Sequence, residues 1–126
     1  MLRINYIVFF FLFFYSYSQD YNIDDYDGQT ISTCSGNFYD SGGPSGVYSA
    51  NEDYTITICP ENDLQLIELD FTSFTSQPVQ NGNGDGLEIY DGVNISAPLI
   101  NMYSGTNSNS GPGFITASNE TGCLTF

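Results

Sequence analysis

Apolar and polar residues alternate with a period of two in several short stretches of this chain. In the stretch QLIELDF, Ile67, Leu69 and Phe71 alternate with Glu68 and Asp70. A β-strand places two such sets on opposite faces, whereas a helix would scatter the acids around its circumference. We therefore predict a strand here, with its apolar face toward a core and its acidic face toward solvent.

Further short strands are predicted at regular spacing, because runs of β-branched, aromatic and aliphatic residues are separated by turn residues. The Gly-Pro-Ser cluster at 41–46 and the Asn-Gly repeats at 81–86 are typical of turns, and the repeats predict a hairpin-like one. No window outside the first residues shows helical periodicity. The pattern predicts one all-β domain, a sandwich or a barrel. The further strands are expected at 54–58, 87–90, 98–103, 114–117 and 123–126.

The first eighteen residues have the pattern of a secretory signal peptide. Arg3 supplies a positive start, residues 7–14 are apolar, and small residues precede Gln19, the expected mature N-terminus. The apolar run is shorter than the roughly 20 residues that span a bilayer. We therefore expect secretion, to the extracellular medium or the cell surface. Residues 19–33 are polar and acidic, and predict an irregular arm or a short edge strand.

The charge balance narrows the possible functions. Beyond residue 18 the chain carries all 15 of its acidic residues and no Lys, Arg or His, a formal charge of −15. Nucleic acids are bound through cationic groups, so they are excluded as partners, and anionic membrane surfaces are disfavoured for the same reason. Carboxylates without cationic partners are solvated, protonated or metal-bound, and calcium is the ion that best matches oxygen ligands. For most of these acids a solvated surface is the preferred interpretation.

The same inventory disfavours an enzyme. Without His or Lys, the usual general bases, Ser–His pairs and Schiff-base lysines cannot be assembled. A pair of carboxylates could hydrolyse a glycoside, but the acids here fall on outward strand faces and in loops. We expect no catalytic residues.

Three cysteines remain, Cys34, Cys59 and Cys123. An oxidising compartment favours an even number, so one is left over. Either that cysteine is free, or its partner lies in sequence outside this chain. The last residues, GCLTF, have the pattern of the beginning of a β-strand. We therefore expect that the chain is truncated at its C-terminus.

Several segments, taken in order, resemble the CUB family, and in particular the bacterial CUB modules of large secreted proteins. The resemblance runs from about Cys34 to the last residue. It divides the chain into a signal peptide at 1–18, an acidic arm at 19–33 and a CUB-like domain at 34–126, incomplete at its C-terminus. The matching segments are GNFYDSGG at 36–43, YTITIC at 54–59, LDFTSF at 69–74, DGLEIYDG at 85–92, ITAS at 115–118 and CLTF at 123–126.

The resemblance implies an antiparallel β-sandwich of the jelly-roll type, used for extracellular recognition. It also implies a disulfide between Cys34 and Cys59. Cys123 is then unpaired within this chain, with its partner expected in further C-terminal strands.

The resemblance further implies a possible calcium site. Many CUB domains hold Ca²⁺ with a Glu and two Asp side chains, and the bound ion orders a loop that docks a lysine of the partner. Asp85 matches the first Asp, the Glu position falls near Gln77, and the second Asp has no counterpart. Independently, Asn83 and Asp85 alternate with glycines, a spacing that lets side-chain oxygens converge on a hard cation. A tight turn without an ion is the preferred interpretation. A solvated arm is likewise preferred for a second acidic cluster, at 24–27.

The expected function is recognition or adhesion, through an extracellular protein or polysaccharide and with possible assistance from Ca²⁺. A structural spacer in a large surface protein, or an accessory domain of a secreted hydrolase, are the alternatives. An exposed apolar or aromatic patch would favour recognition, and a uniformly polar surface a spacer. Tyr39, Tyr48 and Tyr103 could stack on sugar rings, although packing at the rim of the core is preferred. Asn94 and Asn119 begin glycosylation sequons, relevant in a eukaryotic host.

Overall fold

A computed structural model describes residues 18–81, 83–105 and 111–126 of the chain, so the predicted signal peptide lies outside the described residues except for Ser18. The described part is built from short strands and a single 3-10 turn, as the alternating sequence predicts. The elements are β1 (Gln19–Asn22), η1 (Ile23–Tyr26), β2 (Thr30–Thr33), β3 (Gly36–Tyr39), β4 (Thr57–Pro60), β5 (Glu68–Asp70), β6 (Leu87–Tyr90), β7 (Leu99–Tyr103), β8 (Phe114–Thr116) and β9 (Leu124–Thr125).

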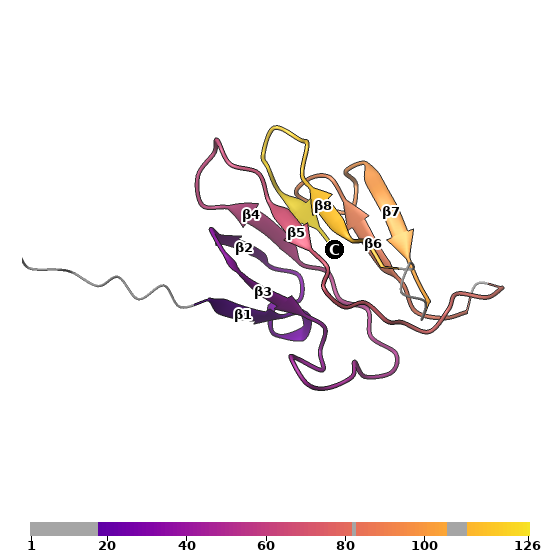
Figure 1. The fold of residues 1–126 in the computed structure, drawn as a ribbon. Helices are drawn as coiled ribbons and strands as arrows, with labels where there is room; N and C mark the ends of the chain where they lie inside the picture. Colours follow the sequence, from indigo (N-terminus) through magenta and orange to yellow (C-terminus); the bar gives the residue numbers. More distant parts are fainter. Residues whose placement is uncertain (1–17, 82, 106–110) are drawn as a thin grey trace, which may run out of the picture.

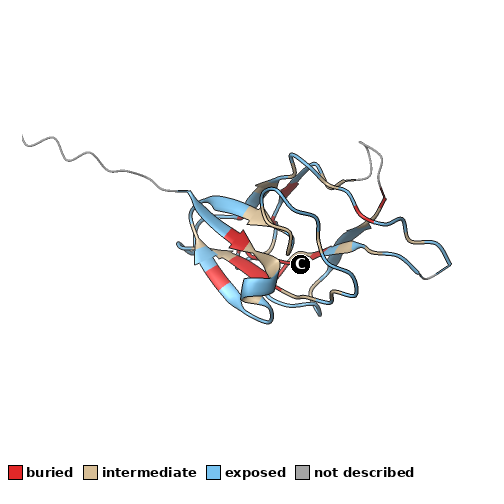
Figure 2. Ribbon diagram, turned by 90° about the horizontal axis from the view of Figure 1, so that it is seen from below, coloured by how far each residue is buried: buried red, intermediate tan, exposed pale blue. Residues whose placement is uncertain are grey.

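The strands form two facing layers (Figure 1). One layer is a five-stranded sheet in the order β2-β4-β9-β6-β7, and the other contains two separate pairs, β1-β3 and β5-β8. The core lies between the layers and draws Ile58, Ile89 and Leu124 from the five-stranded sheet, and Tyr21 and Ile115 from the other layer. Figure 2 shows short buried stretches within the strands and mostly exposed loops between them. The all-β sandwich is therefore confirmed.

The alternation of the QLIELDF stretch is also confirmed. Ile67 is buried and Leu69 and Phe71 pack against the core, whereas Glu68 and Asp70 are exposed. The strand itself is shorter than the pattern, since only the central residues pair with β8. Pairing needs a partner of equal length, whereas the pattern records only which face is buried.

The N-terminal segment contains short edge strands, one of the two expected alternatives, and is not an irregular arm. β1 and β2 both lie at the edges of their sheets, but Tyr21 and Ile31 are buried in the core. Residues 19–33 therefore belong to the sandwich. β1 pairs with β3, and β2 with β4, in parallel, so the sandwich is antiparallel only in its other pairings.

Buried polar groups within the five-stranded sheet are satisfied. Thr57 and Thr125 face one another on β4 and β9, and their hydroxyl oxygens lie 2.8 Å apart. The Thr125 hydroxyl also donates to the carbonyl oxygen of Gly92, at 2.8 Å. An unpaired hydroxyl at this depth would cost about 1–3 kcal/mol, so this network fixes the turn after β6 against the sheet.

Candidate functional site

The cysteine pairing differs from the expected one. The disulfide joins Cys59 to Cys123, whose Cα atoms are 4.2 Å apart, and Cys34 is free and exposed. The pairing of Cys34 with Cys59, and an unpaired Cys123, were therefore wrong.

Strand register explains the difference. β4 and β9 run antiparallel with Ile58 opposite Leu124, which sets Cys59 directly opposite Cys123. In the parallel pair of β2 and β4, by contrast, Cys59 is opposite Ser32, and Cys34 lies beyond the end of β2. Directly opposed residues on an antiparallel pair bring their β-carbons within disulfide range.

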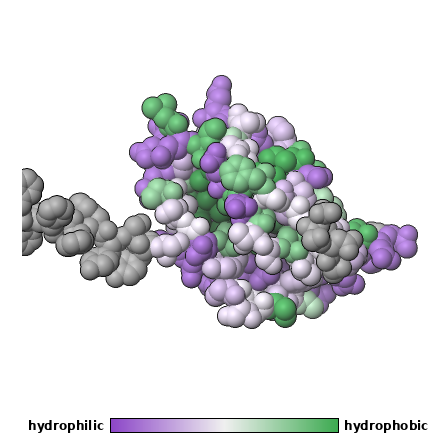
Figure 3. Space-filling model, in the orientation of Figure 1, coloured by the Kyte–Doolittle hydropathy of each residue, from purple (hydrophilic) through white to green (hydrophobic). Residues whose placement is uncertain are grey.

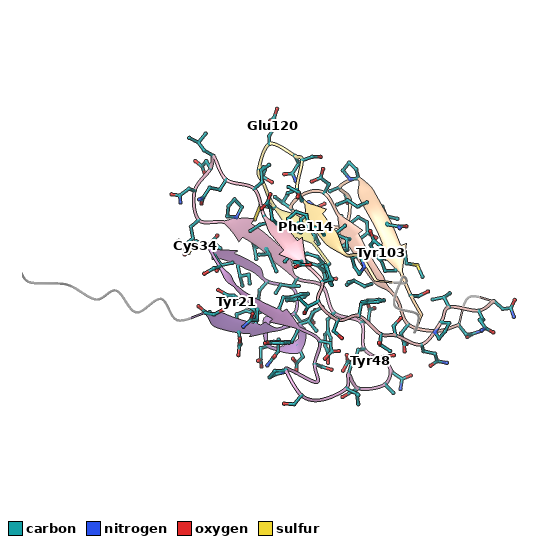
Figure 4. The ribbon with its side chains drawn as sticks, in the orientation of Figure 1. Tyr21, Cys34, Tyr48, Tyr103, Phe114 and Glu120 are labelled. Atoms are coloured by element: carbon teal, nitrogen blue, oxygen red, sulfur yellow. A yellow bond between two sulfur atoms is a disulfide. The ribbon has the colours of Figure 1, made fainter. Side chains whose placement is uncertain are left out.

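The structure brings together two of the three predicted calcium ligands, Asp85 and Gln77, through backbone contacts and a tyrosine. The amide of Asp85 donates to the carbonyl oxygen of Gln77 at 3.0 Å. The Tyr48 hydroxyl donates to Asp85 Oδ2 at 2.8 Å and accepts from the backbone N–H of Gln77 at 3.0 Å. The hydrogen bond to Asp85 raises the pKa of Tyr48 above its usual value of 10.0. Figure 4 shows Tyr48 in a loop at the edge of the molecule opposite the loop that holds Glu120.

The third predicted ligand, Asn83, belongs to a tight turn. The backbones of Gln80 and Asn83 exchange hydrogen bonds of 2.7 and 3.0 Å, and Asn81 adopts a positive φ of 53°. The Asn83 side chain points its amide toward the carbonyl oxygen of Asn81 at 3.5 Å. The preference for a hairpin-like turn is confirmed, and nothing in these contacts joins Asn83 to Asp85.

The described residues do not form a ready-made metal cage. No group of three or more acidic, Cys or His side chains among them could hold a metal ion. In the 24–27 cluster, Asp25 accepts a hydrogen bond from Asn22 and Asp27 accepts one from the amide of Thr55. These acids therefore connect neighbouring segments. Any calcium beside Asp85 would rely on one carboxylate and neutral oxygens, an arrangement typical of weak sites.

A surface that the sequence did not single out lies on the outward face of β6 and β7. Register pairs Glu88 with Met102 and Tyr90 with Leu99, across a bulge that follows Ile89. Because Ile89 is buried, the alternating Glu88 and Tyr90 face outward. Leu99 is 50% exposed and Met102 40% exposed. We call these four residues, Glu88, Tyr90, Leu99 and Met102, the outer β6–β7 surface.

This surface borders the Asp85 loop. A methyl group placed on Gly86, the neighbour of Asp85, would lie 2.9 Å from the terminal methyl of Met102. In the loop from β6 to β7, Val93 and Ile95 are also exposed, at 48% and 59%. On the surface itself the Tyr90 hydroxyl donates to Glu88, and this bond raises the pKa of Tyr90 above its usual value. Apolar area, an aromatic ring and carboxylates thus lie side by side, the mixture typical of recognition surfaces.

Asp91 holds the base of this surface in place. Its carboxylate accepts hydrogen bonds from the amide and the hydroxyl of Ser118, at 2.9 and 2.5 Å, and from the side-chain amide of Asn119 at 2.6 Å. Partial burial raises the pKa of Asp91, but the bonds from Ser118 and Asn119 outweigh it, so the pKa lies below its usual value. Asp91 was not singled out as a functional residue from the sequence. The Asp-Gly pair after β6 was the available signal.

The tyrosines divide between structural and surface roles. Tyr103 packs against the core from β7, and Tyr39 is half-buried at the end of β3. Tyr48 is half-buried, with its hydroxyl engaged as above. Packing at the rim of the core, the preferred interpretation, describes Tyr103 well.

The amino-acid sequence of this chain is similar to parts of cubilin from three mammals. The chain is 36% identical over 105 residues to cubilin of Sus scrofa and 34% identical over 102 residues to that of Canis lupus familiaris, each covering 76% of this chain. The human protein is 37% identical over 73 residues, or 58% of the chain. The chain spans only 2–3% of the length of these relatives. No family model matches, and no solved structure matches.

These relatives are mammalian, so a bacterial type stays a prediction. No helix in the described part of the chain is long and apolar enough to cross a membrane. Cubilin is made of CUB domains, and the matched region spans most of a two-layered all-β sandwich. The similarity and the fold together support a CUB-like domain in this chain.

Proposed function

We propose that this chain is an extracellular recognition module that binds a protein or polysaccharide through the outer β6–β7 surface and the adjoining Asp85 loop. The observation that carries the proposal is the exposed apolar area at this place, which Leu99 and Met102 form beside Tyr90. Scattered apolar residues are normal on a protein surface, whereas neighbouring ones rimmed by polar groups mark interaction sites. A spacer needs no such patch.

Charge favours a ligand with cationic groups. Glu88 and Asp85 flank the apolar residues, and the chain has no Lys, Arg or His beyond Arg3 to neutralise them. Complementary charges accelerate association and suppress wrong partners, more than they add affinity. A protein with a basic, partly apolar epitope therefore fits better than a neutral polysaccharide.

Calcium assistance is the finer part of this proposal. Asp85 is held against Gln77 by the Tyr48 bridge, which leaves one charged ligand near the backbone carbonyl oxygen of Gln77. With so few charges, we expect a dissociation constant in the range of extracellular calcium modules, about 10⁻⁴–10⁻³ M. Thermal unfolding in calcium and in chelator tests this, with Asp85→Asn as the variant and Asp70→Asn as the control. A shift in the wild type that Asp85→Asn abolishes supports the site, and an equal shift in both variants contradicts it.

Recognition itself is tested by presenting the secreted chain to arrays of purified extracellular proteins and of polysaccharides, each with calcium and with chelator. The proposal expects saturable binding to members that carry basic groups. Binding to neither array would favour the spacer. Turnover of an arrayed polysaccharide would favour a hydrolase.

A further inference from the structure

The segment between β5 and β6 ends in a tight turn in which a glycine follows an asparagine, Asn83-Gly84. This segment projects from the sandwich, and Figures 1 and 3 show its tip, with hydrophilic side chains, at the right of both views. Asn83 is exposed, so water reaches its side chain. Asparagine loses its side-chain amide most easily before glycine, because glycine has no side chain to obstruct access to its backbone nitrogen.

The carboxamide of Asn83 is held less firmly than those of other asparagines. Its nitrogen lies 3.5 Å from the carbonyl oxygen of Asn81, at the outer limit of a hydrogen bond. By contrast, the carboxamide nitrogen of Asn119 donates two hydrogen bonds, of 2.6 and 2.8 Å, and that of Asn37 donates one of 2.8 Å. Glutamate and phenylalanine follow these two asparagines, so their backbone neighbours are also more crowded.

We propose that Asn83 is a site of spontaneous deamidation. The backbone nitrogen of Gly84 loses its proton to a base of the solvent and forms a bond to Cγ of Asn83. The bond from Cγ to the carboxamide nitrogen breaks, and this nitrogen takes up a proton and leaves as ammonia. Water then opens the five-membered imide at either of its two carbonyl carbons. The net reaction consumes one water and releases one ammonia, and it leaves aspartate or isoaspartate at position 83.

The two products differ in their effect on the loop. Gln80 and Asn83 exchange backbone hydrogen bonds of 2.7 and 3.0 Å, and at the base of the same loop the amide of Asp85 donates to Gln77 at 3.0 Å. Aspartate keeps the main chain and adds one negative charge. Isoaspartate redirects the main chain through the former side chain and lengthens it by one carbon–carbon bond, about 1.5 Å. The hydrogen bonds across the turn then lose their register.

The surroundings of Gly84 leave little room for a longer main chain. Its φ is +129°, and a Cβ placed on it would lie 2.5 Å from the carbonyl oxygen of Pro78. Because backbone atoms approach Gly84 so closely, an added atom has to displace the turn. The displacement reaches Asp85, whose amide is held by Gln77 and whose carboxylate is held by Tyr48. Isoaspartate at position 83 should therefore loosen the Asp85 loop.

Peptide mapping of the full exported chain tests the site. The folded chain is incubated in mildly acidic and in mildly alkaline buffer and then cleaved after acidic residues. Mass spectrometry with electron-transfer fragmentation distinguishes Asn83 from Asn81 on the same peptide, and aspartate from isoaspartate. We expect Asn83 to convert at least about tenfold faster than Asn37 and Asn119, and faster in alkaline buffer because the attacking nitrogen must lose its proton. Equal rates at these residues, or a rate at Asn83 that does not rise with pH, would overturn the proposal.

Two variants separate the chemistry from its structural effect. Asn83→Gln keeps a carboxamide but would need a larger, slower-forming imide ring, so it should abolish conversion at this position. Asn83→Asp reproduces the added charge without the longer main chain. The amide of Asp85 should exchange hydrogen at least about tenfold faster in the isoaspartate product, isolated by chromatography, and at the wild-type rate in Asn83→Asp. Equal exchange in the isoaspartate product and in Asn83→Asp would contradict the coupling of this turn to Asp85.

Discussion

Removal of the Cys59–Cys123 disulfide should strongly destabilise the sandwich. The bond closes a loop with a sequence separation of 64 residues. On the chain-entropy model a loop of this length stabilises the fold by roughly 4 kcal/mol, because it restricts the unfolded chain. Urea unfolding of the Cys59→Ala, Cys123→Ala double variant should show a loss of about this size in the free energy of unfolding.

Cys34→Ala is the matched control, since Cys34 is exposed and free. It should change the free energy of unfolding by less than about 0.5 kcal/mol, as expected for a surface substitution. A loss below about 1 kcal/mol in the double variant, or an equal loss in Cys34→Ala, would refute this reasoning.

Peptide mapping tests the pairing directly. Arg3 is the chain's only basic residue, so trypsin is of no use, but cleavage after acidic residues separates all three cysteines. We expect a cross-linked pair of peptides that contains Cys59 and Cys123. A cross-link between Cys34 and Cys59 would restore the pairing that the family resemblance implies.

The remaining predictions concern single residues. Asp91→Ala should lower the free energy of unfolding by roughly 2 kcal/mol at neutral pH, the range of hydrogen bonds to a charged group. Because the pKa of Asp91 is lowered in the folded state, this stabilisation is present above the unfolded pKa of about 3.9 and is lost as the pH falls through the folded pKa. The stabilities of the wild type and the variant should therefore converge in acid. Gly122→Ala should lower the free energy of unfolding in urea by roughly 3 kcal/mol or more, because the φ of Gly122 is +68° and the new methyl would lie 2.2 Å from a backbone oxygen. Gly28→Ala is the control, since its φ is +69° but its surroundings are open, and it should lower the free energy of unfolding by only about 1 kcal/mol. In a eukaryotic secretory host, mass spectrometry of the folded product should find a glycan on exposed Asn94 and none on Asn119. The side-chain amide of Asn119 already donates to Asp91 and to a backbone oxygen. A glycan on Asn119 of a stable product would contradict this prediction.

Local patterns predicted β5 to β9 well, because alternation records which face of a strand is buried. By contrast, β3 was not predicted, and β4 begins at Thr57 and not at the expected residue 54. The stretch from Leu87 to Tyr90 was predicted with its observed limits, and the faces of Ile67 and Glu68 were correct. The tight turn at Gln80 to Asn83 also followed from the Asn-Gly repeats. Each of these features depends on neighbours within a few residues.

Long-range features could not be predicted from the sequence. The partner of Cys59 depends on the register of β4 and β9, which no local pattern specifies. The contact of Tyr48 with Asp85 spans 37 positions along the chain. The outer β6–β7 surface was missed because Leu99 and Met102 look like core residues until the bulge and the neighbouring strands assign them to the outer face.

The most direct test of recognition through the outer β6–β7 surface is a comparison of two variants against the strongest ligand from the protein array. Met102→Lys places a charge at the centre of the surface, whereas Leu64→Lys makes a similar change at an isolated side chain that is 99% exposed. Surface plasmon resonance should show at least tenfold weaker binding for Met102→Lys, or about 1.4 kcal/mol, and unchanged binding for Leu64→Lys. Equal affinities for Met102→Lys and the wild type would contradict the assignment of ligand binding to this surface.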